Sequence, residues 1–361
     1  MNRVTGHRTG GKMRVLVTGG AGFIGSNFIR FLLAHRPTWQ ILNVDKLTYA
    51  GNLENLKDLW DHPGYRFVQA DICDRSLMDS LLSPPQGMDA VVNFAAETHV
   101  DRSLEDSFGF IQTNVVGTQT LLEVVRQRGV GRLLQISTDE VYGSLGPTGA
   151  FSEESPPCPN SPYAASKAAA DFLLRAYAHT YRLPAIITRS SNNYGAYQFP
   201  EKLIPLLITS ALADTPLPLY GDGLYVRDWL YVEDHCRALL QILESGRVGE
   251  IYNIGGSAEY TNLAVAQMIL HELGKPESLI AFVADRPGHD RRYALDCQKI
   301  QQEFGWTPEH TFPDGLRSTI RWYVEHEDWW RRIQAGEYQE YYRRHYGPRL
   351  SAAADRGRVE R

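Results

Sequence analysis

The stretch RVLVTGGAGFIGSN, residues 14–27, decides the fold that this sequence predicts. A short apolar run leads directly into a glycine-rich turn, and an amphipathic helical pattern over residues 24–35 follows. Gly19, Gly22 and Gly25 let the backbone turn tightly and approach a phosphate, which then lies at the N-terminus of the helix. A glycine triplet alone is a weak signal, but a strand before it and a helix after it predict a dinucleotide-binding βαβ unit.

The same alternation continues along the chain. Apolar strand-like runs occupy residues 14–19, 40–45, 65–71, 89–96, 132–137 and 185–189, and helical patterns cover residues 108–128 and 163–180. Continuous apolar strands that alternate with helices are typical of parallel strands buried on both faces. We therefore expect an α/β fold with a doubly wound parallel sheet of the Rossmann type.

After about residue 190 turn-rich segments become frequent, with helical patterns at 232–244 and 262–273. This change predicts a smaller, loop-rich C-terminal substrate lobe. The expected organisation is a disordered extension (1–12), a dinucleotide-binding Rossmann domain (13–190), a second, substrate-binding lobe with some return to the first domain (191–345) and a disordered tail (346–361).

Composition excludes several classes of protein. The 361 residues are 43% hydrophobic and 22% charged with a net charge of −5, which argues against a nucleic-acid partner. Four scattered cysteines suggest neither a zinc site nor a disulfide framework, and we expect no metal. The polar start MNRVTGHRTGGKMR is unlike a signal peptide, and no run of 18 apolar residues occurs, so we expect a cytoplasmic protein without a membrane partner.

The cofactor expected at the glycine turn is NAD. Asp45 closes the second strand twenty residues after Gly25, where a carboxylate holds the hydroxyls of the adenosine ribose. That charge would repel a 2′-phosphate, and only Lys46 stands nearby to compensate, so NAD is favoured over NADP. Asp71 and Ile72, at the end of the third strand, are placed for the adenine edge.

A second group of residues indicates proton transfer. Tyr163 and Lys167 in YAASK share one face of a predicted helix. An ammonium group and a positively charged nicotinamide stabilise a phenolate, which would make Tyr163 a general base for a sugar or alcohol hydroxyl. Thr138, at the end of the fifth strand, would bind the same oxygen. The motif alone is weak; together with the glycine turn and Thr138 it is strong.

These motifs resemble the extended short-chain dehydrogenase/reductase family, and within it the dTDP-glucose 4,6-dehydratases. The resemblance covers residues 13 to 345 and rests on GGAGFIGSN, DKLTYAGNLENL, AAETHVDRS, STDEVYG, YAASKAAAD, SNNYGAYQFPEKLIP, VRDWLYVEDH and RPGHDRRYA. It implies C4 oxidation, elimination of water across C5 and C6, and C6 reduction of one sugar.

The resemblance also gives a role to Asp139 and Glu140, two acids that follow Thr138 directly. Glu140 would take the C5 proton, and Asp139 would donate one to the departing C6 hydroxyl. Neighbouring carboxyl groups push their pKa values apart, so one protonated and one ionised group is reasonable near neutral pH.

The binding residues implied by the resemblance form two sets. For NAD they are Gly19, Gly22, Phe23, Ile24, Gly25, Asp45, Lys46, Thr48, Asp71, Ile72, Ala95, Ala96, Thr98, Thr113, Tyr163, Lys167 and Asn193. For the nucleotide sugar they are Ser103, Thr138, Asn192, Lys202, Leu203, Pro218, Leu219, Tyr220, Arg227, Asn262, Asp285, Arg286, Pro287, Gly288, His289 and Tyr293. Asn192 and Arg227 would grip the diphosphate. His99 and Arg102 lie near the sugar end, and His99 fits a structural role equally well; Arg291 and Arg292 fit solvated side chains.

Three alternatives stay open at this point. The first is the same reaction on a UDP- or CDP-sugar, and the second is a nucleotide-sugar C4 epimerase, which has no use for an acid pair. The third is a catalytically inactive NAD-binding regulator, which would be expected to lose Tyr163, Lys167 or the acids. The resemblance further implies a homodimer formed by the helices at 108–128 and 163–180.

Overall fold

The computed structural model describes residues 12–85, 87–335 and 337–359. The predicted extension at residues 1–12 therefore lies almost wholly outside the described residues. The chain forms two compact units, each built from several segments. The first unit contains Met1–Thr138, Pro162–Arg189 and His235–Tyr252, and the second contains Asp139–Ser161, Ser190–Asp234 and Asn253–Arg361. The stretch Asp139–Ser161, which begins with the two acids, thus belongs to the second unit.

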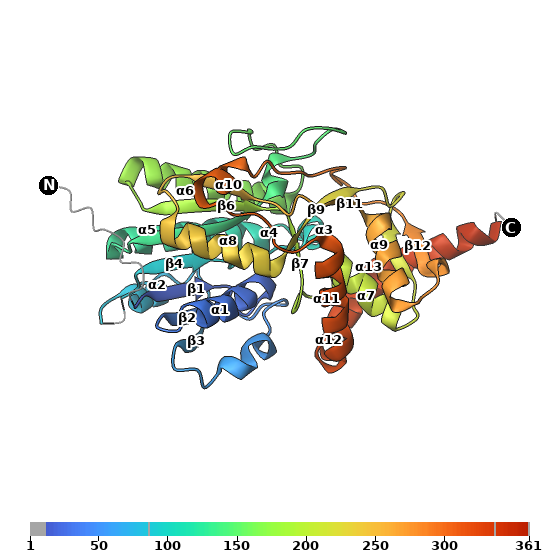
Figure 1. The fold of residues 1–361 in the computed structure, drawn as a ribbon, viewed down its shortest axis with the longest axis horizontal. Coiled ribbons are helices and arrows are strands. Elements are labelled where there is room, and N and C mark those ends of the chain that lie inside the picture. The colour runs from blue at the N-terminus through green and yellow to red at the C-terminus, as the bar shows by residue number, and fades with distance from the viewer. Residues whose placement is uncertain (1–11, 86, 336, 360–361) are drawn as a thin grey trace. The chain divides into compact units, whose positions relative to one another are not determined.

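The first unit is built on a seven-stranded sheet with the order β10-β6-β5-β4-β1-β2-β3 (Figure 1). β1 pairs in parallel with β2 on one side, where Thr18 lies opposite Val44, and with β4 on the other, where Thr18 lies opposite Asn93. The strand order reverses at β1, and ligands of such sheets bind at the carboxyl ends of the strands at this point. The prediction of a doubly wound α/β fold is confirmed.

The strands of this sheet and the helices that accompany them follow one another along the chain as β1 (Arg14–Thr18), α1 (Phe23–His35), β2 (Gln40–Asp45), η1 (Leu53–Leu59), β3 (Tyr65–Gln69), α2 (Arg75–Leu82), β4 (Ala90–Asn93), α3 (Val100–Glu105), α4 (Phe108–Phe110), η2 (Ile111–Gly117), α5 (Thr118–Arg128), β5 (Arg132–Thr138), α6 (Pro162–Tyr181), β6 (Ala185–Ser190), α8 (Val232–Ser245) and β10 (Ile251–Ile254).

Helices cover both faces of the sheet. α2, α5 and α6 pack against one face, where Met78, Leu122 and Leu174 share a core cluster with strand residues. α1 and α8 are joined by Arg36, which makes two hydrogen bonds of 2.6 and 2.8 Å to the Glu244 carboxylate. Buried strands between two helical layers explain why the sequence shows continuous apolar runs instead of alternation.

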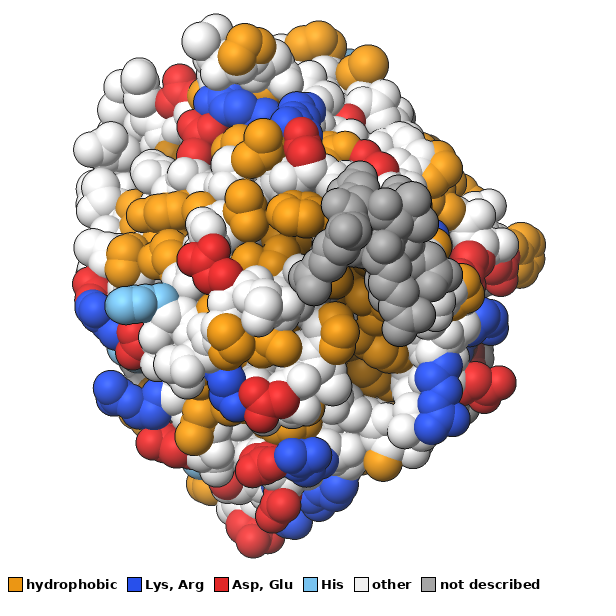
Figure 2. All heavy atoms as spheres, turned by 90° about the vertical axis from the view of Figure 1, so that its right-hand side faces the viewer, with side chains coloured by type: hydrophobic (Ala, Val, Ile, Leu, Met, Phe, Trp, Pro, Cys, Tyr) orange, Lys and Arg blue, Asp and Glu red, His pale blue; other side chains and the backbone are white. Residues whose placement is uncertain are grey.

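The second unit has its own core and two small sheets, of order β11-β9-β7 and β12-β8. Its elements are η3 (Asp139–Tyr142), β7 (Asn192–Tyr194), α7 (Leu203–Leu212), β8 (Leu217–Tyr220), β9 (Val226–Tyr231), β11 (Glu259–Thr261), α9 (Asn262–Leu273), η4 (Glu277–Leu279), β12 (Ile280–Val283), α10 (Gln298–Phe304), α11 (Phe312–Glu325), α12 (Glu327–Gln334) and α13 (Glu337–Val359). Figure 2 shows the side on which α9, β12 and α13 are drawn in Figure 1, with apolar side chains among charged ones.

Helix α13 occupies most of the stretch for which a disordered tail was predicted. It runs to Val359 and includes SAAADRGR, whose alanines and arginines are strong helix formers. In its first half Tyr338, Tyr341 and Tyr346 are buried. Packing of the aromatic half explains why the helix continues where composition alone indicated disorder.

Candidate active site

The glycine turn after β1 is too crowded for side chains. Gly19 has a φ of +69°, and a Cβ added to it would lie 2.5 Å from the backbone nitrogen of Ala95. A Cβ on Gly25 would lie 2.4 Å from the carbonyl oxygen of Gly19. Helix α1 begins directly after Gly22, and its first turn carries no acidic side chain. The turn therefore presents backbone N–H groups and a helix N-terminus suited to a phosphate.

Asp45 ends β2 and holds this turn in place. One of its carboxylate oxygens accepts a hydrogen bond of 2.9 Å from the N–H of Ala21, and the other accepts one of 2.8 Å from Leu47. Burial raises the pKa of Asp45, and the two backbone hydrogen bonds oppose that change. Because a carboxylate has about four lone-pair sites, each oxygen can still accept from a ribose hydroxyl.

The cation beside Asp45 is already engaged. The Lys46 ammonium lies 2.7 Å from a carboxylate oxygen of Asp71. The hydrogen bond to Asp71 raises the pKa of Lys46. Burial acts to raise the pKa of Asp71, but its hydrogen bonds with Lys46 and Cys73 outweigh burial, and the pKa is lowered. An ammonium paired in this way is a poor partner for a 2′-phosphate, which agrees with the preference for NAD.

The remaining predicted cofactor residues belong mostly to the first unit. Phe23 and Ile24 open α1, Thr48 follows β2, and Ile72 is buried after β3; Ala95, Ala96 and Thr98 follow β4, and Thr113 lies in the π-helical turn η2. Asn193 belongs to β7 of the second unit, where its amide donates to Ser190 and to the carbonyl of Ser191.

Thr138, Tyr163 and Lys167 are all buried in the first unit. Tyr163 and Lys167 both belong to α6, as predicted, and the ring of Tyr163 packs edge-on against Phe110. The Lys167 ammonium donates a hydrogen bond of 2.7 Å to the carbonyl of Ile136, two residues before Thr138. Burial lowers the pKa of Lys167 to about 8, although the Asp171 carboxylate works in the opposite direction.

Sequence reasoning missed two polar residues that hold this group. Asn114 in η2 accepts from the N–H of Glu97 and donates to the carbonyl of Glu97 and to Ser166, which connects the stretch after β4 with α6. Asp171 accepts a hydrogen bond of 2.9 Å from Arg189, and both side chains are almost fully buried. Asp171 could have been noticed, because it lies one helical turn after Lys167 in YAASKAAAD.

Asp139 and Glu140 open the second unit as the first residues of η3. Asp139 is 2% exposed. Burial raises the pKa of Glu140, and the positive charges of Arg286, Arg227 and Lys202 oppose that change. The turn closes at Gly143, whose φ is +84°. Glu140 is thus an acid whose proton affinity is raised although three cations surround it.

Arg227 lies at the centre of the small sheet β11-β9-β7, paired with Tyr260 of β11. Its guanidinium is buried, donates to the carbonyls of Val226 (2.8 Å) and Asp290 (2.9 Å), and lies 4.6 Å from the centre of the Tyr293 ring. Asn192 is on the adjacent strand β7. A buried guanidinium that still has N–H groups for another acceptor is suited to a diphosphate.

An aromatic group surrounds the predicted base-binding residues. The His289 ring stacks on Tyr225 with centroids 3.7 Å apart, and its Nδ1 lies 2.7 Å from Asp285. Burial, together with the nearby charges of Arg286 and Arg227, lowers the pKa of His289 to about 4. The Tyr220 hydroxyl is 2.7 Å from Nε2 of His345 in α13. The other residues predicted to bind the nucleoside belong to the same unit: Lys202 and Leu203 at the start of α7, Pro218 and Leu219 in β8, Asn262 at the start of α9, and Pro287 and Gly288 after β12.

Several polar residues of the sequence motifs have structural partners. His99 caps α3, since its Nδ1 accepts from the N–H of Arg102. Ser103 is buried and donates its hydroxyl to the carbonyl of Val100 at 2.6 Å, and Arg102 lies 4.0 Å from the Tyr49 ring centre.

Arg291 and Arg292 are not merely solvated, because each forms an ion pair, although Arg291 is exposed as predicted. Arg291 makes two hydrogen bonds to Asp222, of 2.8 and 2.9 Å. Arg292 makes two to Glu259, of 2.6 and 2.8 Å. Partners 69 and 33 residues away in sequence could not be read from the local pattern.

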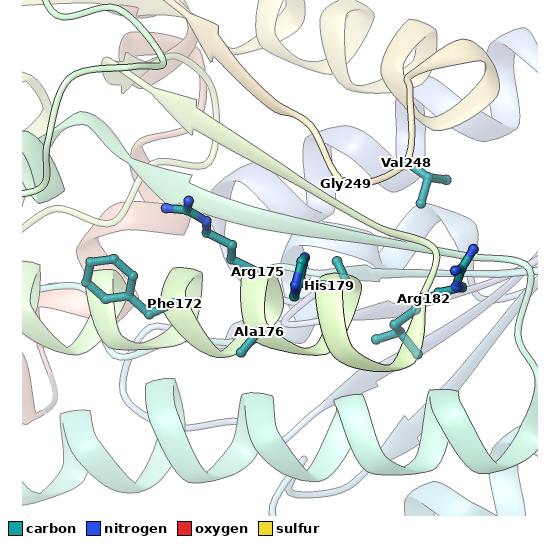
Figure 3. Close-up of a pocket in the computed structure, with 9 residues that line it drawn as sticks. Phe172, Arg175, Ala176, His179, Arg182, Val248 and Gly249 are labelled. Atoms are coloured by element: carbon teal, nitrogen blue, oxygen red, sulfur yellow. The ribbon is translucent and has the colours of Figure 1, made fainter.

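An open pocket of about 800 Å³ lies elsewhere, on the outer side of α6 (Figure 3). Phe172, Arg175, His179 and Arg182 line it from α6, and Val248 and Gly249 line it from the loop after α8. It contains none of the predicted site residues. Within the described ranges, no cluster of three His, Cys, Asp or Glu residues is arranged to hold a metal ion. In the same ranges, no helix combines the length and apolar character needed to cross a membrane.

Comparison with known proteins gives consistent matches. Residues 16–319 match the model of the family described as GDP-mannose 4,6 dehydratase. The chain is 54% identical over 342 residues to dTDP-glucose 4,6-dehydratase of Xanthomonas campestris pv. campestris (strain B100), covering 90% of this chain and 97% of the relative.

Two solved structures are similar throughout. DesIV, a dTDP-glucose 4,6-dehydratase from Streptomyces venezuelae crystallised with NAD bound, has a TM-score of 0.87 and 52% identity, covering 89% of this chain and 100% of DesIV. The dTDP-glucose 4,6-dehydratase of Bacillus anthracis in complex with NAD has a TM-score of 0.84 and 52% identity, covering 89% and 99%.

Proposed function

We infer that this chain, which belongs to the dTDP-glucose 4,6-dehydratase family, dehydrates dTDP-glucose to dTDP-4-keto-6-deoxyglucose with NAD as its cofactor. The observation that carries the inference is the succession Thr138, Asp139, Glu140 at the end of β5, in a chain 54% identical to such an enzyme over nearly all its length. A C4 epimerase needs the threonine but has no use for the acid pair.

The described residues fit NAD. The glycine turn leaves no space for a Cβ at Gly19 or Gly25, and α1 starts there without an acidic side chain. Asp45 is buried next to this turn and Lys46 is neutralised by Asp71. These features suit a pyrophosphate and an unphosphorylated ribose. NAD, when bound, supplies the hydride acceptor for C4 and the hydride donor for C6.

For the first proton transfer we assign Tyr163 as the base that takes the C4 hydroxyl proton. Lys167 belongs to the same helix, and its ammonium favours the phenolate form of the tyrosine. Thr138 orients the sugar oxygen. The hydrogen bond from Lys167 to Ile136 fixes the lysine against the end of β5 and so limits its freedom to turn away.

For the elimination we assign Glu140 as the base and Asp139 as the acid. Oxidation at C4 acidifies the C5 proton, which Glu140 takes, while Asp139 protonates the departing C6 hydroxyl. A raised pKa makes Glu140 a stronger base than an exposed carboxylate, and it also allows the group to return its proton to C5. Arg227 and Asn192 hold the diphosphate, and Tyr220, Asn262 and the stretch 285–289 hold the nucleoside.

We also propose a homodimer. Phe108 is 72% exposed and Phe172 is 52% exposed, and they belong to α4 and α6 of the first unit. Ile111, Val116 and Tyr181 are exposed on the same group of helices. Exposed large apolar side chains that gather on neighbouring helices are typical of an interface. A cytoplasmic location stays a prediction from the four scattered cysteines.

The test follows deuterium in two labelling experiments. dTDP-glucose carrying deuterium at C4 is incubated in H₂O without added reductant, and the label should reappear at C6 of the same molecule. Unlabelled substrate in D₂O should acquire solvent deuterium at C5. Loss of the C4 label to solvent, or a strict need for added NADPH, would contradict the proposed function.

A further inference from the structure

Asp290 is a buried acid to which the sequence assigns no role. It is 7% exposed and joins three parts of the second unit. One carboxylate oxygen accepts a hydrogen bond of 2.6 Å from the amide of Asn160, and the other accepts one of 2.5 Å from the hydroxyl of Tyr293. Its backbone carbonyl accepts from the guanidinium of Arg227 at 2.9 Å. One residue thus holds two predicted substrate-binding side chains.

The segment that contains Asn160 packs against the turn that carries the acids. The N–H of Cys158 donates to the carbonyl of Val141 at 2.9 Å. A Cβ on Gly143 would lie 2.3 Å from the carbonyl oxygen of Cys158, and one on Gly288 would lie 2.9 Å from that of Asn160. Residues 158–160 therefore fill the space between the acid turn and the stretch leading to Asp290.

The stretch is fixed on its other side as well. Arg291, next to Asp290, is paired with Asp222, and Arg292 is paired with Glu259. The backbone N–H of Leu145, just after the acid turn, donates to the carbonyl of Arg292 at 2.9 Å. Asp290 is therefore held at a defined place relative to Glu140, and its charge acts there from a fixed position.

Asp290 also changes the electrostatic surroundings of Glu140. Burial raises the pKa of Glu140, Arg286, Arg227 and Lys202 lower it, and the negative charge of Asp290 raises it. Without the negative charge of Asp290, the three cations would lower the pKa of Glu140 further, and Glu140 would be a weaker base. The titratable or charged groups that bear on Glu140 within this unit are Asp139, Lys202, Arg227, Arg286, Asp290 and Tyr293.

We propose that Asp290 is a positioning residue for the elimination step: its carboxylate holds Asn160 and Tyr293, and its backbone carbonyl holds Arg227, next to the turn that carries Glu140. This inference rests on the proposed function, because it gives Glu140 the role of C5 base. Asp290 itself contacts Asn160, Tyr293 and Arg227, and it acts on the reaction through its neighbours.

The deciding variant is Asp290→Asn, which keeps the size of the side chain and removes its charge. The backbone acceptor for Arg227 stays, so KM should change no more than about twofold, while kcat should fall by about tenfold or more because the base is weaker. With the negative charge gone, the acidic limb of the pH profile for C5 proton exchange should move to lower pH. Formation of NADH in a single turnover should stay close to wild type.

The matched control is Asp222→Asn, the same chemical change at the exposed partner of Arg291. Asp222→Asn should leave the acidic limb of the pH profile for C5 proton exchange at its wild-type position. Asp290→Glu, which keeps the negative charge, should bring the limb back toward that position. An unmoved or upward-shifted limb in Asp290→Asn, or an equal shift in Asp222→Asn, would overturn the proposal. Wild-type protein that fails to turn over dTDP-glucose would instead overturn the proposed function.

A second variant covers the case in which Asp290→Asn does not fold. Tyr293→Phe removes the hydroxyl that donates a hydrogen bond to Asp290. The negative charge of Asp290 stays, and this hydrogen bond no longer offsets part of it. The acidic limb should therefore stay in place or move to higher pH. A shift to lower pH in Tyr293→Phe would contradict the proposed role of the Asp290 charge.

Discussion

At the residue scale, the two adjacent acids have different surroundings. Asp139 is almost fully buried, whereas Glu140 is partly buried among cations from three other segments. Neighbours in sequence can therefore carry out opposite proton transfers. Their order in the chain says nothing about which is the base, because the pKa of Glu140 depends on groups more than sixty residues away.

The two acids can be separated by single-turnover chemistry. Asp139→Asn keeps Glu140, so it should still oxidise C4 and exchange the C5 proton while expelling water about 10²–10⁴-fold more slowly. Glu140→Gln should lose C5 exchange and elimination together. Rapid quench with mass spectrometry measures both steps. Blocked NADH formation in Asp139→Asn, with normal formation in Tyr163→Phe, would mean that the roles are wrongly assigned.

Lys167 should leave a signature in the pH dependence of stability. Its pKa is about 8 in the folded chain and 10.5 as a free group, so the unfolded chain binds more protons between these values. Below about pH 8 the buried ammonium of Lys167 destabilises the folded chain. The free energy of unfolding should therefore rise by about 3 kcal/mol in total as the pH rises from about 8 to 10.5.

The measurement is the free energy of unfolding against pH for wild type and Lys167→Met. The variant should lack the rise between about pH 8 and 10.5, because it has no ammonium group to deprotonate. Lys57→Met, at an exposed lysine, is the control and should keep the pH dependence of the wild type. Identical pH profiles for all three proteins would show that Lys167 is not destabilised by burial.

At the element scale, α6 carries both the two residues that we assign to the first proton transfer and a buried ion pair to the sheet. Its first turns carry Tyr163 and Lys167, and one turn later Asp171 pairs with Arg189 at the end of β6. Burial raises the pKa of Asp171, and the charge of Arg189 opposes this. The pair fixes the helix to the sheet at the level where Lys167 reaches Ile136.

Breaking this pair should be costly. Asp171→Asn removes the negative charge that faces the buried guanidinium of Arg189 and should lower the free energy of unfolding by about 3–5 kcal/mol. The double variant Asp171→Leu/Arg189→Met should lose less, because no charge stays buried. Glu327→Gln, in the exposed pair with Arg331, should cost at most about 1 kcal/mol. Denaturant titration measures all three, and equal losses in Asp171→Asn and Glu327→Gln would contradict the argument.

At the scale of the whole molecule, the exposed apolar side chains of the first unit predict how two copies meet. α4, η2 and α6 carry five such side chains, all more than a third exposed: Phe108, Ile111, Val116, Phe172 and Tyr181. Aromatic side chains dominate the energetics of interfaces when they become buried.

Phe108→Glu and Phe172→Glu should therefore each yield a monomer, because a carboxylate cannot be buried in an apolar interface without a partner. Phe282→Glu, at a 45% exposed residue of β12 in the second unit, is the control and should leave the mass unchanged. Light scattering should give twice the chain mass for wild type and control. A wild type that is monomeric across the working concentrations would remove the proposed dimer.

The sequence by itself determined the fold class, six of the seven strands of the sheet and the glycine turn, whereas β10 and the order of the strands in the sheet were not predicted. Strands at 40–45 and a helix ending at residue 35 were predicted to the residue, because apolar runs and glycine turns are local signals. Motifs at fixed spacing also placed Tyr163 and Lys167 on one helix.

Only the tertiary structure decided what the charged side chains do. His99 proved to cap α3, Arg291 and Arg292 to form ion pairs, and Asp290 to hold Asn160 from 130 residues away. The lowered pKa of Lys167 depends on burial, and the raised pKa of Glu140 depends on burial and on four distant charges. Proton affinity is set by the dielectric and the charges around a group, and these exist only after distant segments have packed together.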